Sequence, residues 1–283
     1  MESVQKRYAF RGTFLEADLA RPGAFAQLVG DLHPHLTINL VGYGVDREER
    51  DAGLARRLNA ELPVEIAGEI ARRPPETDWA GQRLIHVGSA FEYGSAEGSV
   101  HEETSCAPAS VYGQTKLAGT RGVAQIRRET GLAAVTLRIA TVYGPGEHPH
   151  RLLPSLIRAS HTGETLSLTA GGQERDFTFV GDVAEGILRT AAVARVPWDT
   201  INLATGELTT VRAFATCAIE RLGLGPGKVA FGALPYREDE VWQGRIEVGR
   251  MKQVLEWVPA TGIAEGVRRT IEFETRCAET MHE

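Results

Sequence analysis

The 283-residue sequence predicts an α/β fold, a doubly wound parallel sheet with helices on both of its faces. Three observations support this prediction. Short apolar runs alternate with amphipathic helical stretches along nearly the whole chain. The run "LTINLV" at 36–41 is apolar almost throughout, which is typical of a strand covered on both faces. No internal repeat or low-complexity tract interrupts the alternation.

The elements follow one another as strand and helix in turn. Strands are expected at 13–18, 36–41, 83–89, 133–143 and 200–204. Helices are expected at 22–32, 48–73, 109–129, 151–162, 181–194, 210–222 and 262–278. Pro22 suits the start of its helix, and Pro63 predicts a kink in the long helix 48–73.

Composition excludes several classes of protein. The net charge is −6 and no basic block occurs, so nucleic acid is not expected as the main partner. The N-terminus has no apolar leader region, and no apolar run approaches the roughly 18 residues that cross a bilayer. Cys106, Cys217 and Cys277 are odd in number and far apart, which favours free thiols in a reducing compartment. We therefore expect a cytoplasmic protein.

Turn-rich stretches mark where chemistry is expected. In an open α/β sheet, ligands bind beyond the carboxyl ends of the strands. Ser89 ends one predicted strand, and "ATVYGPG" (140–146) ends another. The stretch "GLGPGK" (223–228) is one residue short of a phosphate-binding loop and is followed by Val229, so we interpret it as a helix end and a turn.

Tyr112 and Lys116 lie four residues apart on a predicted helix. Alone, such a pair is a helical contact contributing a few tenths of a kcal/mol. The surrounding motifs give it more weight, because Ser89 ends a strand upstream and an apolar strand with "VYGPG" follows downstream. The motifs are "VGSAFEYG" (87–94), "PASVYGQTK" (108–116), "LRIATVYGPG" (137–146), "RDFTFVGDVAEGIL" (175–188), "INLATGELTTVRAF" (201–214) and "LEWVPATGIAEGVRRTIEF" (255–273).

Together these motifs resemble the extended short-chain dehydrogenases/reductases, specifically the NAD-dependent epimerase/dehydratase family, which acts largely on nucleotide sugars. The resemblance runs from about Phe14 to Phe273. It implies a Rossmann-like sheet and a smaller α+β substrate-binding region. Residues 1–145, with 175–204 returning to them, would form the cofactor domain, and 146–283 would mainly bind substrate.

The resemblance implies a catalytic set of Ser89, Tyr112 and Lys116. A tyrosine transfers a proton to or from a sugar oxygen only if its pKa, about 10 when free, falls toward neutrality. Lys116 is expected to lower that pKa and to bind the nicotinamide ribose, and Ser89 to hydrogen-bond the substrate oxygen. The reaction would be epimerisation or 4-keto reduction of a nucleotide-activated sugar.

The same resemblance implies binding residues, a cofactor and a partner. NAD or NADP would contact Asp18, Leu19, Val41, Gly42, Asn59, Tyr112, Lys116 and Ile139. The nucleotide sugar would contact Ser89, Ala90, Thr141, Arg175 and Arg237, although either arginine could instead form a surface ion pair. No metal is required, and His33, His35, His148 and His150 are interpreted as loop residues. A homodimer is expected through helices 48–73 and 109–129.

Two departures from the family pattern matter. No G-x-x-G-x-x-G or G-x-G-x-x-G occurs, and the recognisable pattern begins at "TFLEADL" (13–19), which matches the third strand. The chain is then either an incomplete version of a normal enzyme or a shorter protein whose sheet is rearranged or completed by a partner. A non-catalytic nucleotide- or partner-binding protein that has lost the phosphate loop is the alternative function.

The second departure concerns the residues after Ser89. Dehydratases of this family carry an Asp-Glu pair there for the elimination of water, but this chain has Ala90 and Phe91. Glu92 follows, and side-chain alternation means that it need not face the sugar. A dehydratase is therefore disfavoured. The choice between NAD and NADP stays open, because the residue that distinguishes them has no counterpart here.

Overall fold

A four-stranded parallel sheet forms the centre of the molecule, with strand order β1-β2-β4-β9. The computed structural model describes residues 11–30, 32–45, 48–73, 79–238 and 240–280. The strands are β1 (Thr37–Asn39), β2 (Leu84–Ser89), β4 (Ala134–Ile139) and β9 (Thr200–Leu203). All four point the same way, so their carboxyl ends meet along one edge.

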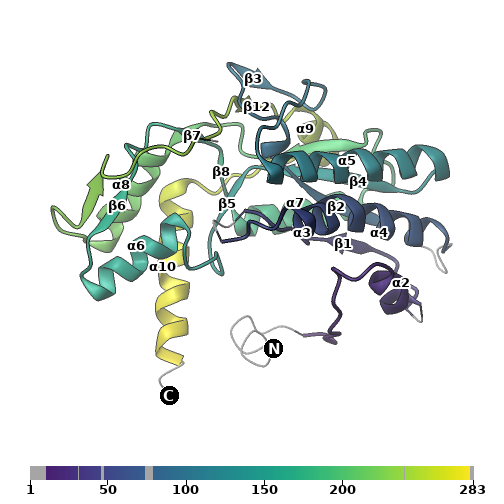
Figure 1. Ribbon diagram of the computed structural model, residues 1–283, viewed down its shortest axis with the longest axis horizontal. Helices are drawn as coiled ribbons and strands as arrows, with labels where there is room; N and C mark the ends of the chain where they lie inside the picture. The colour runs from purple at the N-terminus through teal and green to yellow at the C-terminus, as the bar shows by residue number, and fades with distance from the viewer. Residues whose placement is uncertain (1–10, 31, 46–47, 74–78, 239, 281–283) are drawn as a thin grey trace.

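Helices cover both faces of this sheet, which occupies the right half of Figure 1. One face packs against α4 (Leu62–Ala71) and α5 (Val111–Thr130), and the other against α7 (Val180–Ala192) and α9 (Gly249–Leu255). Neighbouring strand residues belong to opposite clusters, since Leu84 packs with α4 whereas Ile85 packs with α7. This alternation follows from the two-residue period of a strand.

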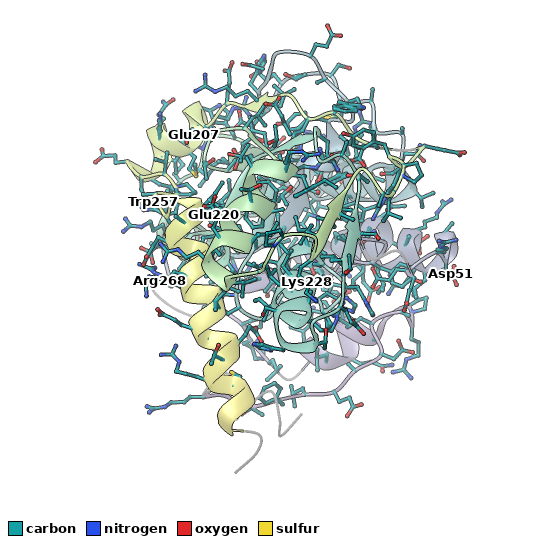
Figure 2. The ribbon with its side chains drawn as sticks, turned by 90° about the vertical axis from the view of Figure 1, so that its left-hand side faces the viewer. Asp51, Glu207, Glu220, Lys228, Trp257 and Arg268 are labelled. Atoms are coloured by element: carbon teal, nitrogen blue, oxygen red, sulfur yellow. The ribbon has the colours of Figure 1, made fainter. Side chains whose placement is uncertain are left out.

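A smaller region lies in the left half of Figure 1. It contains α6 (Leu152–Thr162), α8 (Val211–Leu222), α10 (Ile263–Thr280) and the strand pairs β5 (Thr141–Tyr143) with β8 (Phe177–Phe179), β6 (Leu166–Leu168) with β11 (Val229–Phe231) and β7 (Glu174–Arg175) with β10 (Thr209–Thr210). A further pair joins β3 (Ser99–Val100) and β12 (Arg245–Ile246). The core of the smaller region contains Tyr143, Phe177 and Phe214, and the ring centroids of Phe177 and Phe214 are stacked 4.1 Å apart. Figure 2 shows α10 beside α8, with Arg268 and Glu220 on that side of the molecule.

Most predicted elements are confirmed. The helices at 22–32, 109–129, 151–162, 181–194, 210–222 and 262–278 correspond to α2 (Ala24–Val29), α5, α6, α7, α8 and α10. The predicted helix end at 223–228 is also found, because Gly223 closes α8 in the left-handed conformation, with φ of 63°. Within the residues that the structure describes, no helix is long and apolar enough to cross a membrane.

The helix predicted at 48–73 is found over a shorter range, 52–71, and it is irregular. It comprises α3 (Ala52–Arg56), a π-helical turn η1 (Arg57–Glu61) and α4, with Pro63 in the first turn of α4. Pro63 has no N–H to donate to the Asn59 carbonyl. The backbone of Gly119 on α5 approaches that same carbonyl so closely that a Cβ would lie 2.1 Å from it.

Three strand predictions need correction. Residues 13–18 form no strand, because a strand needs a neighbour and no described strand runs beside them. The run 36–41 is not buried on both faces, since Leu40 is 65% exposed at the β1 edge of the sheet. The run 133–143 divides at Ala140, where the chain leaves β4 and enters β5 in a different sheet.

Candidate active site

The carboxyl edge of the central sheet brings together several predicted residues. Ser89 is the last residue of β2, and its register partner across the β2–β4 pair is Ile139. Val41 and Gly42 follow β1 on the other side of β2. The Ser89 side chain is buried and caps a 3₁₀ turn, η2 (Ala90–Glu92), by accepting a hydrogen bond of 3.2 Å from the Phe91 N–H.

Tyr112 stands in the first turn of α5, which points toward this edge. Ser110 caps the helix by accepting a 3.1 Å hydrogen bond from the Gly113 N–H, and this fixes where α5 begins. The Tyr112 ring is partly buried and meets the Phe91 ring edge-on, with centroids 6.0 Å apart. Tyr112 is thereby held above the end of β2.

Lys116 lies one turn further along α5 and is only 3% exposed. Its Nζ donates a 2.5 Å hydrogen bond to the Val87 carbonyl of β2. The buried amine is therefore fixed against the strand that ends at Ser89, and the structure brings all three predicted catalytic residues to one place.

The pKa of Tyr112 is shifted upward in this structure, and the lowering expected beside Lys116 stays a prediction. Burial raises the pKa of Tyr112 to about 12, and a hydrogen bond with the Ser89 side chain acts in the opposite direction. Burial lowers the pKa of Lys116 to about 8, and the negative charge of Glu92 partly opposes this shift by raising the pKa. The pKa of the phenol is raised because burial removes water from its charged form. The Lys116 ammonium donates its hydrogen bond to the Val87 carbonyl.

A buried charge cluster that the sequence did not predict lies below these residues. Glu92 is fully buried and accepts hydrogen bonds from the Ser89 N–H (2.8 Å) and the Thr120 hydroxyl (2.9 Å). Its second oxygen accepts a 2.8 Å hydrogen bond from Arg138 Nε on β4. Only the "E" in "SAFEYG" could have signalled it, because its partner is distant in sequence.

A cavity of about 590 Å³ opens beside Tyr112 and reaches into the smaller region. Phe91, Tyr112, Thr141, Arg175 and Arg237 line it, which brings three of the five predicted substrate residues to one surface. The other two, Ser89 and Ala90, are buried and are not among its described lining residues.

The charged lining of this cavity consists of three arginines and three glutamates, and two of the arginines are paired with two of those glutamates. Arg175 is buried, forms an ion pair with Glu240 and donates a 2.7 Å hydrogen bond to the Val241 carbonyl. Arg151, which was not predicted as a site residue, also lines the cavity and pairs with Glu147 at 3.1 Å. The sequence signal for Arg151 was its place directly after the turn-rich stretch 144–150.

The predicted cofactor side is less closely assembled. Asn59 is buried and holds the loop after β1 by donating to the Tyr43 carbonyl (2.7 Å) and accepting from the Tyr43 N–H (2.9 Å). Leu19 packs against the hydrophobic cluster that includes the buried side chains of α4. Asp18 is exposed and caps its own turn through a 3.0 Å hydrogen bond from the Ala20 N–H.

These residues fit one part of a dinucleotide better than the rest. Tyr112 and Lys116 suit a nicotinamide ribose, because Tyr112 lines the cavity and Lys116 lies one helical turn away, bonded to the Val87 carbonyl near the end of β2. The sequence has no glycine-rich loop at a helix N-terminus to receive a pyrophosphate. Tyr112 and Lys116 are thus the residues that would hold the nicotinamide ribose of NAD(P).

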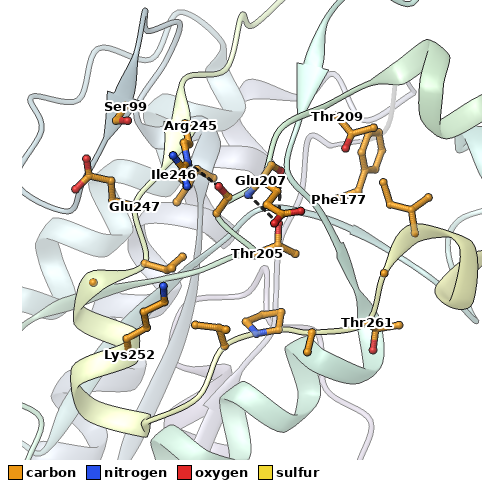
Figure 3. A pocket seen from close by; sticks show the side chains of 18 residues that line it. Ser99, Phe177, Thr205, Glu207, Thr209, Arg245, Ile246, Glu247, Lys252 and Thr261 are labelled. Carbon is orange, nitrogen blue, oxygen red and sulfur yellow. Dashed lines mark hydrogen bonds between the residues drawn. The ribbon is translucent and has the colours of Figure 1, made fainter.

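A second groove of about 580 Å³ lies away from Tyr112, between β12, α9 and the start of α10. Figure 3 shows charged ends of both signs around it, from Glu207, Arg245, Glu247 and Lys252. Arg245 donates a 2.8 Å hydrogen bond to the Gly206 carbonyl, which ties β12 to the loop after β9. None of its described lining residues is a predicted site residue.

Comparison with known proteins decides the family. The model of the NAD-dependent epimerase/dehydratase family matches residues 2–204. The chain belongs to this family. The resemblance predicted from the motifs is thereby confirmed.

Individual members of the epimerase/dehydratase family are similar along different lengths. A Bacillus subtilis protein described as an uncharacterized UDP-glucose epimerase is 28% identical over 68% of this chain, and the match spans 60% of that relative's length. A dTDP-glucose 4,6-dehydratase of Xanthomonas campestris is 25% identical, over 92% of this chain and 78% of the relative.

A solved structure extends the comparison to the fold. MoeE5, in complex with UDP-glucuronic acid and NAD, has a TM-score of 0.78 and 28% identity to this chain, and the match covers 94% of this chain and 85% of MoeE5. This likeness confirms the predicted Rossmann-like doubly wound sheet.

Proposed function

We propose that the chain is an NAD(P)-dependent epimerase or 4-ketoreductase that acts on a nucleotide-activated sugar. The observation that carries the proposal is the convergence of Ser89, Tyr112 and Lys116 at the carboxyl end of β2, beside a cavity whose lining includes three arginines. Membership of the epimerase/dehydratase family and the NAD and UDP-sugar in the MoeE5 complex support it.

The chemistry follows from the roles of the three side chains. Bound NAD(P) supplies or accepts the hydride. Tyr112 takes the proton from the sugar hydroxyl as the carbon is oxidised, and returns it when the carbonyl is reduced. Ser89 donates a hydrogen bond to the same sugar oxygen. Lys116, as an ammonium, holds the ribose and favours the Tyr112 phenolate once its surroundings are filled.

The arginines indicate where the diphosphate of the substrate would lie. Arg151, Arg175 and Arg237 all line the cavity, and a planar guanidinium suits phosphate oxygens. Thr141 begins β5, two residues after Ile139, and lines the same cavity. We infer that the sugar reaches from the arginines toward Tyr112.

The buried state of Glu92 supports epimerisation or ketoreduction over dehydration. Eliminating water requires an acid and a base next to the sugar, but Ala90 and Phe91 cannot supply them. Glu92 has no exposed surface and is held by Arg138, Thr120 and the Ser89 N–H. It is therefore not available as the missing acid.

A single-turnover assay tests the function. The chain is mixed with NAD⁺ or NADP⁺ and UDP- or dTDP-hexoses, or with NADH or NADPH and the corresponding 4-keto sugars. Reduced nicotinamide is followed by absorbance while the sugar products are separated by chromatography. Tyr112→Phe should reduce the rate by about 10²- to 10⁴-fold. Wild-type rates in the Tyr112→Phe variant would count against the proposal. So would a wild-type chain that turns over none of the nucleotide sugars or 4-keto sugars.

Assembly and location complete the proposal. We infer a homodimer in which α4 and α5 of two copies form a four-helix bundle, since these helices pack together on one face of the sheet. A single monomeric species at micromolar concentration in sedimentation would contradict it. A cytoplasmic location is supported by three cysteines that are free thiols in the structure. Recovery of the native protein from an extracytoplasmic fraction would contradict this location.

A further inference from the structure

Glu92 connects three residues around the proposed catalytic set. As the third residue of the capping box at η2, it accepts a hydrogen bond from the Ser89 N–H, while Ser89 caps the same turn. This reciprocal pair fixes the backbone of Ser89 at the end of β2. The Thr120 hydroxyl ties the same carboxylate to α5, the helix that carries Tyr112 and Lys116.

The strand provides a fitted position for this carboxylate. A Cβ at Gly88 would lie 2.6 Å from Glu92 Oε1 and 2.9 Å from the Thr136 Cγ2. Only a glycine at this position lets the carboxylate rest against β2. The arrangement therefore needs both Gly88 and Glu92.

The charge of Glu92 also reaches the acid–base groups. The titratable side chains facing Lys116 from neighbouring elements are Glu92 and His86, and burial with the Lys116 charge holds the pKa of His86 well below its usual range. His86 is therefore neutral. The negative charges of Glu92 and Glu49 also raise the pKa of Tyr112, whereas the positive charge of Arg151 lowers it.

We propose that Glu92 is a positioning residue of this active site: its carboxylate fixes the Ser89 end of β2 and supplies the buried negative charge that balances Lys116. The inference rests on the proposed function for the roles of Ser89, Tyr112 and Lys116. Arg138 forms an ion pair with the other oxygen of the carboxylate, with its Nε 2.8 Å from the Glu92 Oε2.

Lysine NMR tests the electrostatic part without any turnover. The chain has only four lysines, Lys6, Lys116, Lys228 and Lys252, so isotope-labelled lysine gives few signals and Lys116→Met assigns one of them. In Glu92→Gln the Lys116 signal should titrate about one pH unit lower than in the wild type. An unchanged titration would overturn the proposal, whatever the enzyme's activity.

The pH profile of kcat/KM tests the same charge during catalysis. Removing a buried negative charge favours phenolate and neutral amine, so both the Tyr112 and the Lys116 limbs of the profile should move to lower pH in Glu92→Gln. The matched control is Glu65→Gln, which removes the carboxylate of another Arg–Glu pair, with Arg57 at 2.6 Å, and should leave both limbs in place. Limbs that stay fixed in Glu92→Gln, with only the rate reduced, indicate a structural role and overturn the proposal.

A double variant covers the case in which Glu92→Gln does not fold because Arg138 is left unpaired. Glu92→Gln/Arg138→Met removes both charges and should fold, while the lowered Lys116 titration should persist. A wild-type titration in this variant would overturn the proposal. Tyr112→Phe in the same assays separates the two hypotheses, since activity that survives it defeats the proposed function and leaves the lysine NMR result to decide the role of Glu92.

Discussion

Lys116 shows at the level of one residue how a proposed function opposes stability. Its pKa is about 8 in the folded chain against an ordinary value of 10.5, because burial disfavours the ammonium. The unfolded chain therefore binds more protons between those two pH values, and stability rises with pH across that window. Below pH 8 the cost of burying the charge is fully present.

Replacing Lys116 should lower the activity and raise the stability of the chain. Lys116→Met removes the buried charge and keeps the stem, so we expect the free energy of unfolding to rise by about 2 kcal/mol at pH 7 after allowing for the lost hydrogen bond to Val87. The gain should shrink above pH 8, as wild-type Lys116 loses its proton. Urea unfolding at several pH values measures both effects, and a variant less stable than the wild type at pH 7 would contradict the expectation.

Gly88 gives a second prediction at the residue scale. Gly88→Ala places a methyl group 2.6 Å from Glu92 Oε1 and 2.9 Å from Thr136 Cγ2, so the carboxylate must move away from β2. We expect a loss of about 1–3 kcal/mol in stability from overpacking and a lower kcat with an unchanged substrate KM. Thermal unfolding and steady-state kinetics measure these effects, and an alanine variant with wild-type kcat would contradict the expectation.

Among the elements, the contact between α5 and η1 determines how closely the helix carrying Tyr112 can approach. Gly119→Ala would place its Cβ 2.1 Å from the Asn59 carbonyl, which cannot turn aside as a side chain can. We expect a loss of about 2–4 kcal/mol in unfolding experiments, near the upper range for overpacking. Turnover should also fall, since Asn59 anchors the Tyr43 loop.

A matched glycine in a neighbouring helix provides the control for this prediction. Gly68 lies in α4, and a Cβ there would have only the Arg72 guanidinium nearby, at 3.7 Å. Gly68→Ala should therefore stabilise by about 0.5–1 kcal/mol through helix propensity. Equal effects of the two substitutions would show that the close approach of α5 is not what Gly119 provides.

Sequence patterns predicted the elements well where a helix or strand carries its own signal. Helices such as α5 and α8 have caps and periodic apolar faces, and β2 has a buried run ending at Ser89. The run 133–143 was misjudged as one strand because an apolar pattern does not say which sheet receives it. The strand expected at 13–18 failed for a related reason, since pairing is not a local property.

The candidate site divides in the same way. Ser89, Tyr112 and Lys116 were found because their motifs are contiguous in sequence, whereas their roles stay predictions. The Glu92–Arg138 pair was not found, because its members are 46 residues apart and meet only when β2 and β4 become neighbours. Nor could composition show that burial would dominate the pKa of Tyr112.

For the whole molecule, cofactor binding is the decisive measurement. The sequence contains no glycine-rich phosphate loop, while Lys116 and Tyr112 suit a nicotinamide ribose. In fluorescence titrations of the 283-residue chain with NADH and NADPH, we expect nicotinamide mononucleotide to compete better than ADP. Lys116→Met should weaken NADH binding by about tenfold, the equivalent of one lost hydrogen bond to the ligand. Competition by ADP alone would contradict this expectation.

The predicted division of the chain into a cofactor part (1–145, with 175–204 returning) and a mainly substrate-binding part (146–283) stays a prediction. The pairing of β9 with β4 supports the return of the later segment to the central sheet. Limited proteolysis should then cut in the turn-rich stretch 223–244 before it cuts within the central sheet.

The passage of one strand from the central sheet into the smaller region has a mechanical consequence. Ile139 ends β4 and Thr141 begins β5, so one residue, Ala140, separates a proposed cofactor contact from a proposed substrate contact. Extended backbone advances about 3.3 Å per residue, which sets these two contacts about 7 Å apart. Such a short connection fixes the distance between the two contacts. Any rotation of one region relative to the other about this connection would leave the proposed cofactor and substrate contacts at about the same separation.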